Sequence, residues 1–275
     1  MKSSDIDFVI IGAAKCATTW LQRQLQADPG VYMPDPELHF FAREYDRGMD
    51  WYLEQFMPPS TDLLIGEKSN SYLDTDGAAD LVHQHLPHVQ LIAQLRDPVA
   101  RAYSDYCMLY RRGDVNGDIG KYLDPDRAST GRFIVGGDYA AQLERYVALY
   151  GRERLLVLPF ENVATDPVGQ MRNVRQHLGL SVENFEMAPV GKVKDRTDTR
   201  VPPAWRKRLN WLKPIVGPLR GTSGFKAVRG LIAKPSVYPS FPDALREKLE
   251  AYYAPGIRKL EDLTGQSFVA WHDKG

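Results

Sequence analysis

The segment that decides the fold of this chain lies near its beginning and reads Phe8-Val9-Ile10-Ile11-Gly12-Ala13-Ala14-Lys15-Cys16-Ala17-Thr18-Thr19-Trp20-Leu21. A short β-branched run enters a loop of small residues, and the loop opens onto an amphipathic helical pattern. In such a turn the backbone N–H groups at the helix N-terminus converge on one point, and Lys15 adds a full positive charge. The segment predicts a site for a phosphate or sulfate group. A tight turn with an exposed lysine is the alternative interpretation.

This loop differs from a Walker A loop in two respects. Its lysine stands three residues after the first glycine, and its second glycine is replaced. In a Walker A loop the lysine follows the second glycine directly and precedes a serine or threonine. The difference from a Walker A loop affects which anion the loop binds and which reaction that anion undergoes.

The whole chain has the composition of an ordinary soluble protein, with 43% hydrophobic and 25% charged residues. Its 275 residues can bury an α/β core as one domain. We therefore expect a single domain over 1–275, with a basic, partly irregular insertion at about 187–240. The formal net charge is zero, so charge alone suggests no polyanion partner, and we expect no nucleic acid.

Cysteine content and the absence of targeting patterns bear on the compartment. The two cysteines, Cys16 and Cys107, do not suggest a disulfide framework. The sequence shows neither a signal-peptide pattern nor an apolar stretch as long as a membrane span. A cytoplasmic location is the expectation.

Four short apolar segments read as core strands, and helical patterns lie between most of them. This alternation predicts an α/β fold with a P-loop-like central parallel sheet, flanked by helices on both faces. The expected strands are Phe8–Ile11, Leu63–Ile65, Val89–Leu95 and Leu155–Leu158. The expected helices are Thr19–Ala27, Gly77–His85, Pro98–Arg111, Tyr139–Tyr150, Pro167–Leu178, Asp243–Tyr253 and Gly256–Thr264. Asp97 reads as the N-cap of one of them, and the glycine-rich stretch Gly113–Gly137 as a surface loop.

Arg96 stands at the carboxyl end of a predicted core strand, where ligands bind in open α/β sheets. Eight residues later, Ser104 can present a hydroxyl group from the following helix. Together they can hold a second phosphate group. The alternative is that Arg96 simply pairs with a nearby carboxylate.

Glu37 and His39 precede an aromatic pair in Pro36-Glu37-Leu38-His39-Phe40-Phe41. If this stretch is extended, the two side chains share a face. A carboxylate placed in this way can accept a proton from an attacking hydroxyl group. A strand edge with a solvated glutamate is the commoner explanation.

Taken together, these segments resemble the sulfotransferases that use 3′-phosphoadenosine 5′-phosphosulfate (PAPS), particularly the branch with heparan sulfate N- and 3-O-sulfotransferases and their bacterial relatives. The resemblance covers most of the chain. It is carried by Gly12–Leu21, Glu37–Phe41, Gly48-Met49-Asp50-Trp51-Tyr52, Gly66-Glu67-Lys68-Ser69-Asn70-Ser71-Tyr72, Arg96–Tyr106, Tyr252-Tyr253-Ala254-Pro255 and the region from Leu260 to Trp271.

The resemblance implies a role for each matching residue. The 5′-phosphosulfate would lie in the loop formed by Lys15, Cys16, Ala17, Thr18, Thr19 and Trp20. Lys15 would stabilise the leaving phosphate oxygen, and Arg96 with Ser104 would bind the 3′-phosphate. Glu37 would be the general base, His39 would orient the acceptor or Glu37, and Lys68 would line the site near the sulfuryl group. No metal is required, because a sulfuryl group carries less charge than a phosphoryl group.

The stretch from Lys192 to Lys234 departs from the family pattern. It has twelve Lys or Arg against two Asp, and it lacks the cysteines of the disulfide-braced loop in the animal enzymes. Arg196 and Arg200 are candidates for closing over the nucleotide, although a solvated basic loop explains them equally well.

The apolar residues between Trp205 and Leu219 are interleaved with these charges. They suggest packing on the core, a lid over the acceptor, or peripheral contact of residues 192–234 with an anionic membrane at its inner face. His83, His85 and His88 do not make a convincing metal site, since no cysteine or obvious carboxylate ligand lies nearby.

Three functional hypotheses follow. The first is a sulfotransferase that moves a sulfuryl group from PAPS to a hydroxyl or amino group of a carbohydrate or glycolipid acceptor. The second is a P-loop kinase for a small molecule, which lacks the Gly-Lys-Ser/Thr ending and a clear magnesium ligand other than Asp97. The third is a nucleotide-binding module without catalysis.

Overall fold

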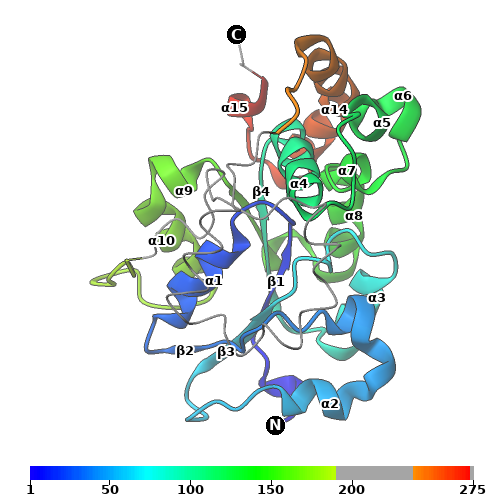
Figure 1. Cartoon of the computed structure of the whole chain (residues 1–275). Helices are drawn as coiled ribbons and strands as arrows, with labels where there is room; N and C mark the ends of the chain where they lie inside the picture. The colour runs from blue at the N-terminus through cyan, green and yellow to red at the C-terminus, as the bar shows by residue number, and fades with distance from the viewer. Residues whose placement is uncertain (190–237, 273–275) are drawn as a thin grey trace, which may run out of the picture.

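A computed structural model describes residues 1–189 and 238–272 (Figure 1). Its centre is a five-stranded sheet in the order β2-β3-β1-β4-β5, and every neighbouring pair is parallel. The strands are β1 (Phe8–Gly12), β2 (Val31–Tyr32), β3 (Leu64–Lys68), β4 (Gln90–Leu95) and β5 (Leu155–Pro159). The predicted α/β class with a parallel sheet is confirmed.

Both faces of the sheet are covered, and the residues of β1 alternate between the two cores. Phe8 and Ile10 pack in one core with residues of α1 (Thr18–Gln26) and α10 (Pro167–His177). Val9 and Ile11 pack in the other core. This second core holds residues of α3 (Ala78–His85), α4 (Pro98–Arg112), α8 (Tyr139–Tyr150) and α14 (Asp243–Thr264). Figure 1 shows α1 and α10 on one side of the sheet and α3 and α8 on the other.

The shorter helices lie in the connections. They are α2 (Gly48–Glu54), α5 (Gly120–Leu123), α6 (Pro125–Ala128), α7 (Arg132–Val135), α9 (Asn162–Thr165) and α15 (Val269–His272). The 3-10 turns η1 (Ser3–Asp5), η3 (Tyr45–Arg47) and η4 (Arg152–Arg154) and the π-helical turn η2 (Phe40–Glu44) complete the described elements. Among these residues, no helix has both the length and the apolar composition that crossing a bilayer requires.

The surface loop predicted for Gly113–Gly137 is wrong, because α5, α6 and α7 lie within it. Each has four residues, too few for a helical period to show in the sequence. Buried Leu123, Phe133 and Ile134 anchor these turns to the core.

The two predicted C-terminal helices are one helix, α14, which continues through Pro255. A proline inside a helix removes one hydrogen bond and costs about 3 kcal/mol. Leu249, Tyr253, Ile257 and Leu260 recur at intervals of three and four residues and are all buried. Their burial spans the proline and holds both halves of the helix on the core.

Gly66 allows β3 to pass close to β1, and we expect Gly66→Ala to destabilise the protein by about 1–3 kcal/mol. Gly66 pairs with Phe8, and a Cβ at this position would overlap the Phe8 ring. Gly256→Ala in α14 is the matched control, because its Cβ would meet nothing within 4 Å. It should stabilise the protein by about 0.5–1 kcal/mol. Urea unfolding measures both changes, and a Gly66→Ala protein as stable as the unsubstituted one would refute the close approach.

Candidate active site

The loops that follow the strands meet at one edge of the sheet, because all five strands are parallel. The loop 13–17 follows β1, Ser69 follows β3, Arg96 follows β4 and Phe160 follows β5. The order β3-β1-β4 places the first three segments side by side. Ligands bind at such an edge in open α/β sheets.

The loop after β1 has the geometry of an anion site. Lys15 and Ala17 have positive φ values of 72° and 60°, which turn successive N–H groups toward one side. Helix α1 begins at Thr18, and its N-cap residue Ala17 makes no side-chain capping bond. The first N–H groups of a helix have no partner within the helix. The loop thus fits the phosphosulfate group that the resemblance implies.

Two buried glutamines brace this loop. Gln94 in β4 donates from Nε2 to the carbonyl oxygen of Cys16, and its own Oε1 accepts from Gln170 Nε2 at 3.0 Å. Burial raises the pKa of the Cys16 thiol to about 11, so the thiol stays protonated at neutral pH. Sequence reasoning missed Gln94 and Gln170. The sign of Gln94 in the sequence was a polar residue near the carboxyl end of a mostly apolar strand.

Lys15 and Lys68 take different positions around the loop. Lys15 Nζ lies 3.5 Å from Met108 Sδ on α4. Lys68, at the end of β3, is 2% exposed, and its Nζ donates to Thr19 Oγ1 at 3.3 Å. The same Nζ lies 2.7 Å from Glu37 Oε1. Lys68 thus joins the first turn of α1 to Glu37.

Glu37 and His39 lie close together, although the stretch is not in the extended conformation assumed from the sequence. Glu37 Oε2 lies 3.7 Å from His39 Nε2 and accepts the backbone N–H of Asn70 at 3.2 Å. On the other side of the ring, His39 Nδ1 is 2.8 Å from Ser71 Oγ. Burial lowers the pKa of His39, so its ring is neutral at neutral pH. Glu37 thus lies between a neutral imidazole ring and the buried side chain of Lys68.

The extended conformation proposed for the stretch around Glu37 is wrong. His39 has φ +52°, in the left-handed region, and η2 begins at Phe40. Phe40 and Phe41 are both buried, although consecutive residues of a strand point to opposite faces. The backbone turns here so that both rings enter the core, and Glu37 and His39 meet across this turn.

Arg96 directly follows β4, with its backbone held on two sides. Its carbonyl oxygen accepts from Tyr139 OH at 2.9 Å, and the next N–H, of Asp97, donates to Glu161 Oε1 at 3.2 Å. The guanidinium carbon lies 4.5 Å from the centroid of the Phe160 ring. Ser104 lies on α4 and is partly exposed. Arg96 is thus positioned at the edge where the loop after β1 lies.

Some of the remaining predicted residues lie on α1, and the others lie outside the described residues. Trp20, on α1, is partly exposed, and Thr18 is buried in the first turn of the same helix. Arg196, Arg200 and the apolar residues from Trp205 to Leu219 lie outside the described residues.

The three clustered histidines make separate contacts. His85 Nε2 is 2.8 Å from Tyr45 OH, His88 Nε2 is 2.9 Å from the Ile6 carbonyl oxygen, and His83 packs against Tyr150. Within 1–189 and 238–272, no group of three His, Cys, Asp or Glu residues is arranged to hold a metal ion.

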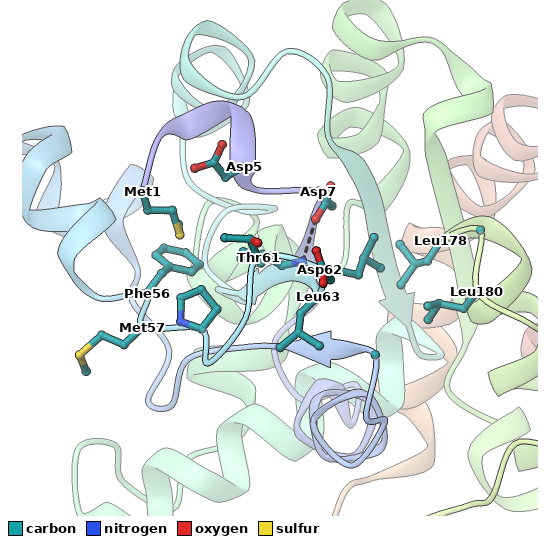
Figure 2. A pocket seen from close by; sticks show the side chains of 15 residues that line it. Met1, Asp5, Asp7, Phe56, Met57, Thr61, Asp62, Leu63, Leu178 and Leu180 are labelled. Carbon is teal, nitrogen blue, oxygen red and sulfur yellow. Dashed lines mark hydrogen bonds between the residues drawn. The ribbon is translucent and has the colours of Figure 1, made fainter.

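A cavity of about 1020 Å³ lies at the opposite edge of the sheet, before β1 and β3 (Figure 2). Met57, Leu63 and Leu180 line it together with Asp7. Asp7 Oδ2 accepts the N–H of Ile65 at 2.7 Å, so this carboxylate caps the start of β3. None of the predicted site residues within 1–189 lines this cavity.

Comparison with known proteins identifies the family of this chain. Residues 51–184 match the model of the sulfotransferase family. Heparan sulfate glucosamine 3-O-sulfotransferase 6 of Mus musculus is 30% identical over 272 residues, covering 94% of this chain and 72% of the mouse protein. Bifunctional heparan sulfate N-deacetylase/N-sulfotransferase 2 of Homo sapiens is 30% identical over 194 residues, covering 63% of this chain and 22% of the human protein.

A solved structure agrees with these relatives. The sulfotransferase from Alicyclobacillus acidocaldarius superposes with a TM-score of 0.72 and 26% identity, covering 98% of this chain and 99% of that one. The similarity therefore extends over the sheet, the loop after β1 and the residues around Glu37. The chain belongs to the sulfotransferase family, and the protein is a sulfotransferase.

Proposed function

We propose that this enzyme transfers a sulfuryl group from PAPS to a hydroxyl or amino group of a carbohydrate or glycolipid acceptor. The observation that carries the proposal is the position of Lys68. Its ammonium group contacts Thr19, in the anion-binding turn, and Glu37, the candidate base. The names of the relatives, which act on heparan sulfate, favour a carbohydrate acceptor.

The donor side of the site follows from its anion-binding groups. The loop from Lys15 to Trp20 would hold the 5′-phosphosulfate, while Arg96 and Ser104 would bind the 3′-phosphate. Sulfuryl transfer depends on in-line positioning and on stabilising negative charge that spreads over the transferred group. Lys15 would stabilise the charge that develops on the leaving phosphate oxygen.

The acceptor side depends on Glu37. The acceptor oxygen or nitrogen forms its bond to sulfur while the bond from sulfur to the phosphate oxygen breaks, and Glu37 takes the acceptor proton. Because His39 is neutral, it can orient Glu37 or the acceptor without competing for that proton. Lys68 lies where the two ligands meet and would stabilise the transferring group.

The kinase hypothesis requires a carboxylate for magnesium, and Asp97 was its candidate. Asp97 Oδ1 instead accepts the N–H of Val99 at 2.9 Å and that of Ala100 at 3.4 Å, so this carboxylate caps α4. This use of Asp97 favours sulfuryl transfer, and we propose that the reaction needs no divalent ion.

Calorimetry and transfer assays together test the proposed function. We expect adenosine 3′,5′-bisphosphate to bind equally well with and without EDTA, and ATP to bind weakly under both conditions. Heparan sulfate and its N-desulfated form serve as probe acceptors with ³⁵S-labelled donor. Binding of ATP only with magnesium would contradict the donor assignment. If the bisphosphate binds but no carbohydrate or glycolipid acceptor receives the ³⁵S label, the acceptor assignment is contradicted.

The cytoplasmic location stays a prediction, as does peripheral contact of residues 192–234 with an anionic membrane. That stretch lies outside the described residues. Co-sedimentation with vesicles that contain anionic lipid measures the contact, and equal recovery with neutral vesicles would refute it.

Arg96→Ala is expected to weaken binding of adenosine 3′,5′-bisphosphate by roughly ten- to a hundredfold. A hydrogen bond to a charged group is worth about 1.5–3 kcal/mol, and the variant removes the charge assigned to the 3′-phosphate. Binding of 5′-AMP, which lacks that phosphate, should change little. Arg112→Ala, at the exposed end of α4, is the control. If Arg96→Ala weakens the binding of both nucleotides equally, Arg96 does not bind the 3′-phosphate.

A further inference from the structure

Glu67 is a fully buried carboxylate that the proposed chemistry does not use. It lies in β3, next to Lys68, with 0% of its surface exposed. Three hydroxyl groups donate to it: Tyr52 OH to Oε1 at 2.9 Å, Tyr72 OH to Oε1 at 2.7 Å, and Ser69 Oγ to Oε2 at 2.8 Å. A buried carboxylate is costly unless it is hydrogen-bonded in this way. Glu67 directly precedes Lys68, a residue of the candidate active site.

Ser69 connects this carboxylate to the active site. Its Oγ donates to Glu67 and also accepts the backbone N–H of His39 at 2.8 Å. A serine hydroxyl has one proton, and giving that proton to Glu67 turns a lone pair toward His39. His39 has φ +52°, a conformation that residues other than glycine adopt rarely. The bond from His39 to Ser69 therefore holds a backbone turn that the chain does not favour by itself.

The same turn sets the positions of both side chains that face the acceptor. Ser71 Oγ contacts the His39 ring, and the backbone N–H of Asn70 donates to Glu37. The segment 69–71 thus holds Glu37 and His39 through three consecutive residues, and Ser69 is the one that Glu67 fixes.

We propose that Glu67 is a positioning residue. Through the Ser69 hydroxyl it fixes the His39 turn and keeps the Glu37–His39 pair aligned toward the acceptor. The role at the acceptor rests on the proposed function, whereas the alignment itself is a property of the protein without ligands.

Three variants separate this role from a general contribution to stability. Ser69→Ala removes the link to His39, and Glu67→Gln presents an amide group where Ser69 needs an acceptor. Tyr52→Phe is the matched control, because it also removes one hydrogen bond to Glu67, on Oε1, but does not involve Ser69. Binding of adenosine 3′,5′-bisphosphate within twofold of the unsubstituted protein verifies that each variant is folded.

The pH dependence of stability helps to distinguish a positioning role of Glu67 from a purely structural one. Burial raises the pKa of Glu67 to about 6, so this group's contribution to stability is present at low pH and lost as the pH rises through 6. Glu67→Gln lacks this ionisable group, so its free energy of unfolding should not show the decline with rising pH that Glu67 causes in the unsubstituted protein. A purely structural role for Glu67 predicts loss of activity and loss of stability together.

The first measurement is NMR of the histidine rings in protein labelled on its six histidines, with His39 assigned through His39→Gln. We expect the His39 signal to shift in Ser69→Ala and Glu67→Gln, and the pKa of His39 to rise toward its ordinary value as the ring gains water. Tyr52→Phe should leave both unchanged. This readout requires no acceptor.

The second measurement is kcat with heparan sulfate as the probe acceptor. We expect Ser69→Ala and Glu67→Gln to lower kcat at least tenfold, and Tyr52→Phe to stay within twofold. An unchanged His39 signal in the first two variants overturns the proposal, as does an equal loss of activity in Tyr52→Phe. If the signal moves but the unsubstituted protein transfers no label to any acceptor, the alignment by Glu67 stands and the proposed function fails.

Discussion

Glu37→Gln is expected to lower the rate of sulfuryl transfer by about 10²–10⁴-fold, the range that general base catalysis contributes. The amide group keeps the shape of the side chain but cannot take the acceptor proton. Lys68 loses its ion pair with Glu37 at the same time, and its ammonium group becomes available to the donor. Adenosine 3′,5′-bisphosphate should therefore bind as tightly as before or more tightly.

Single-turnover transfer from labelled donor to heparan sulfate measures this rate, and calorimetry measures the binding. Glu144→Gln is the control, because Glu144 on α8 forms an exposed ion pair with Lys259 at 3.2 Å and none with Lys68. A Glu37→Gln enzyme within tenfold of the unsubstituted rate would show that another group accepts the proton.

Lys15→Ala should lower turnover by about a hundredfold or more. A preorganised donor that acts on developing negative charge is worth about 2.7–4 kcal/mol. Lys15 Nζ lies 3.5 Å from Met108 Sδ on α4, and the residue itself lies in the loop after β1. On the proposed function, the Lys15 side chain would stabilise the leaving phosphate oxygen, and the variant removes that contribution.

Backbone conformation complicates this substitution, and a second variant resolves it. Lys15 has φ +72°, which alanine tolerates less well than glycine. Lys15→Gly removes the same charge but adopts this φ without strain. Steady-state kinetics should show equal losses in the two variants if the charge is responsible. Recovery of turnover in Lys15→Gly would assign the loss to the backbone and contradict the role of the ammonium group.

Much of the sheet was predictable because its strands carry their own pattern. The alternation in Phe8–Ile11 corresponds to two separate cores, and the four apolar segments became β1, β3, β4 and β5. The edge strand β2 was missed, since two residues carry no period. Strand β3 continues through Glu67 and Lys68, polar residues whose partners come from elsewhere in the chain.

The contacts among the candidate site residues were not predictable from the sequence. Local sequence patterns selected Lys15, Glu37 and His39, and the family resemblance added Lys68. The contact from Lys68 to Glu37 lies beside a turn that the sequence pattern did not predict. The turn at His39 follows from the burial of both Phe40 and Phe41 and from a bond to Ser69. Local propensity does not encode bonds between segments thirty residues apart.

Lys68 Nζ contacts both the turn proposed to bind the donor, at Thr19, and the proposed base, Glu37. On the proposed function, a negatively charged donor at Thr19 would attract the same Lys68 Nζ that lies 2.7 Å from Glu37 Oε1, so occupancy on one side would change the electrostatic free energy on the other. Thermodynamic linkage makes such coupling reciprocal. On the proposed function, donor and acceptor would therefore alter each other's affinity by one and the same factor through this buried charge.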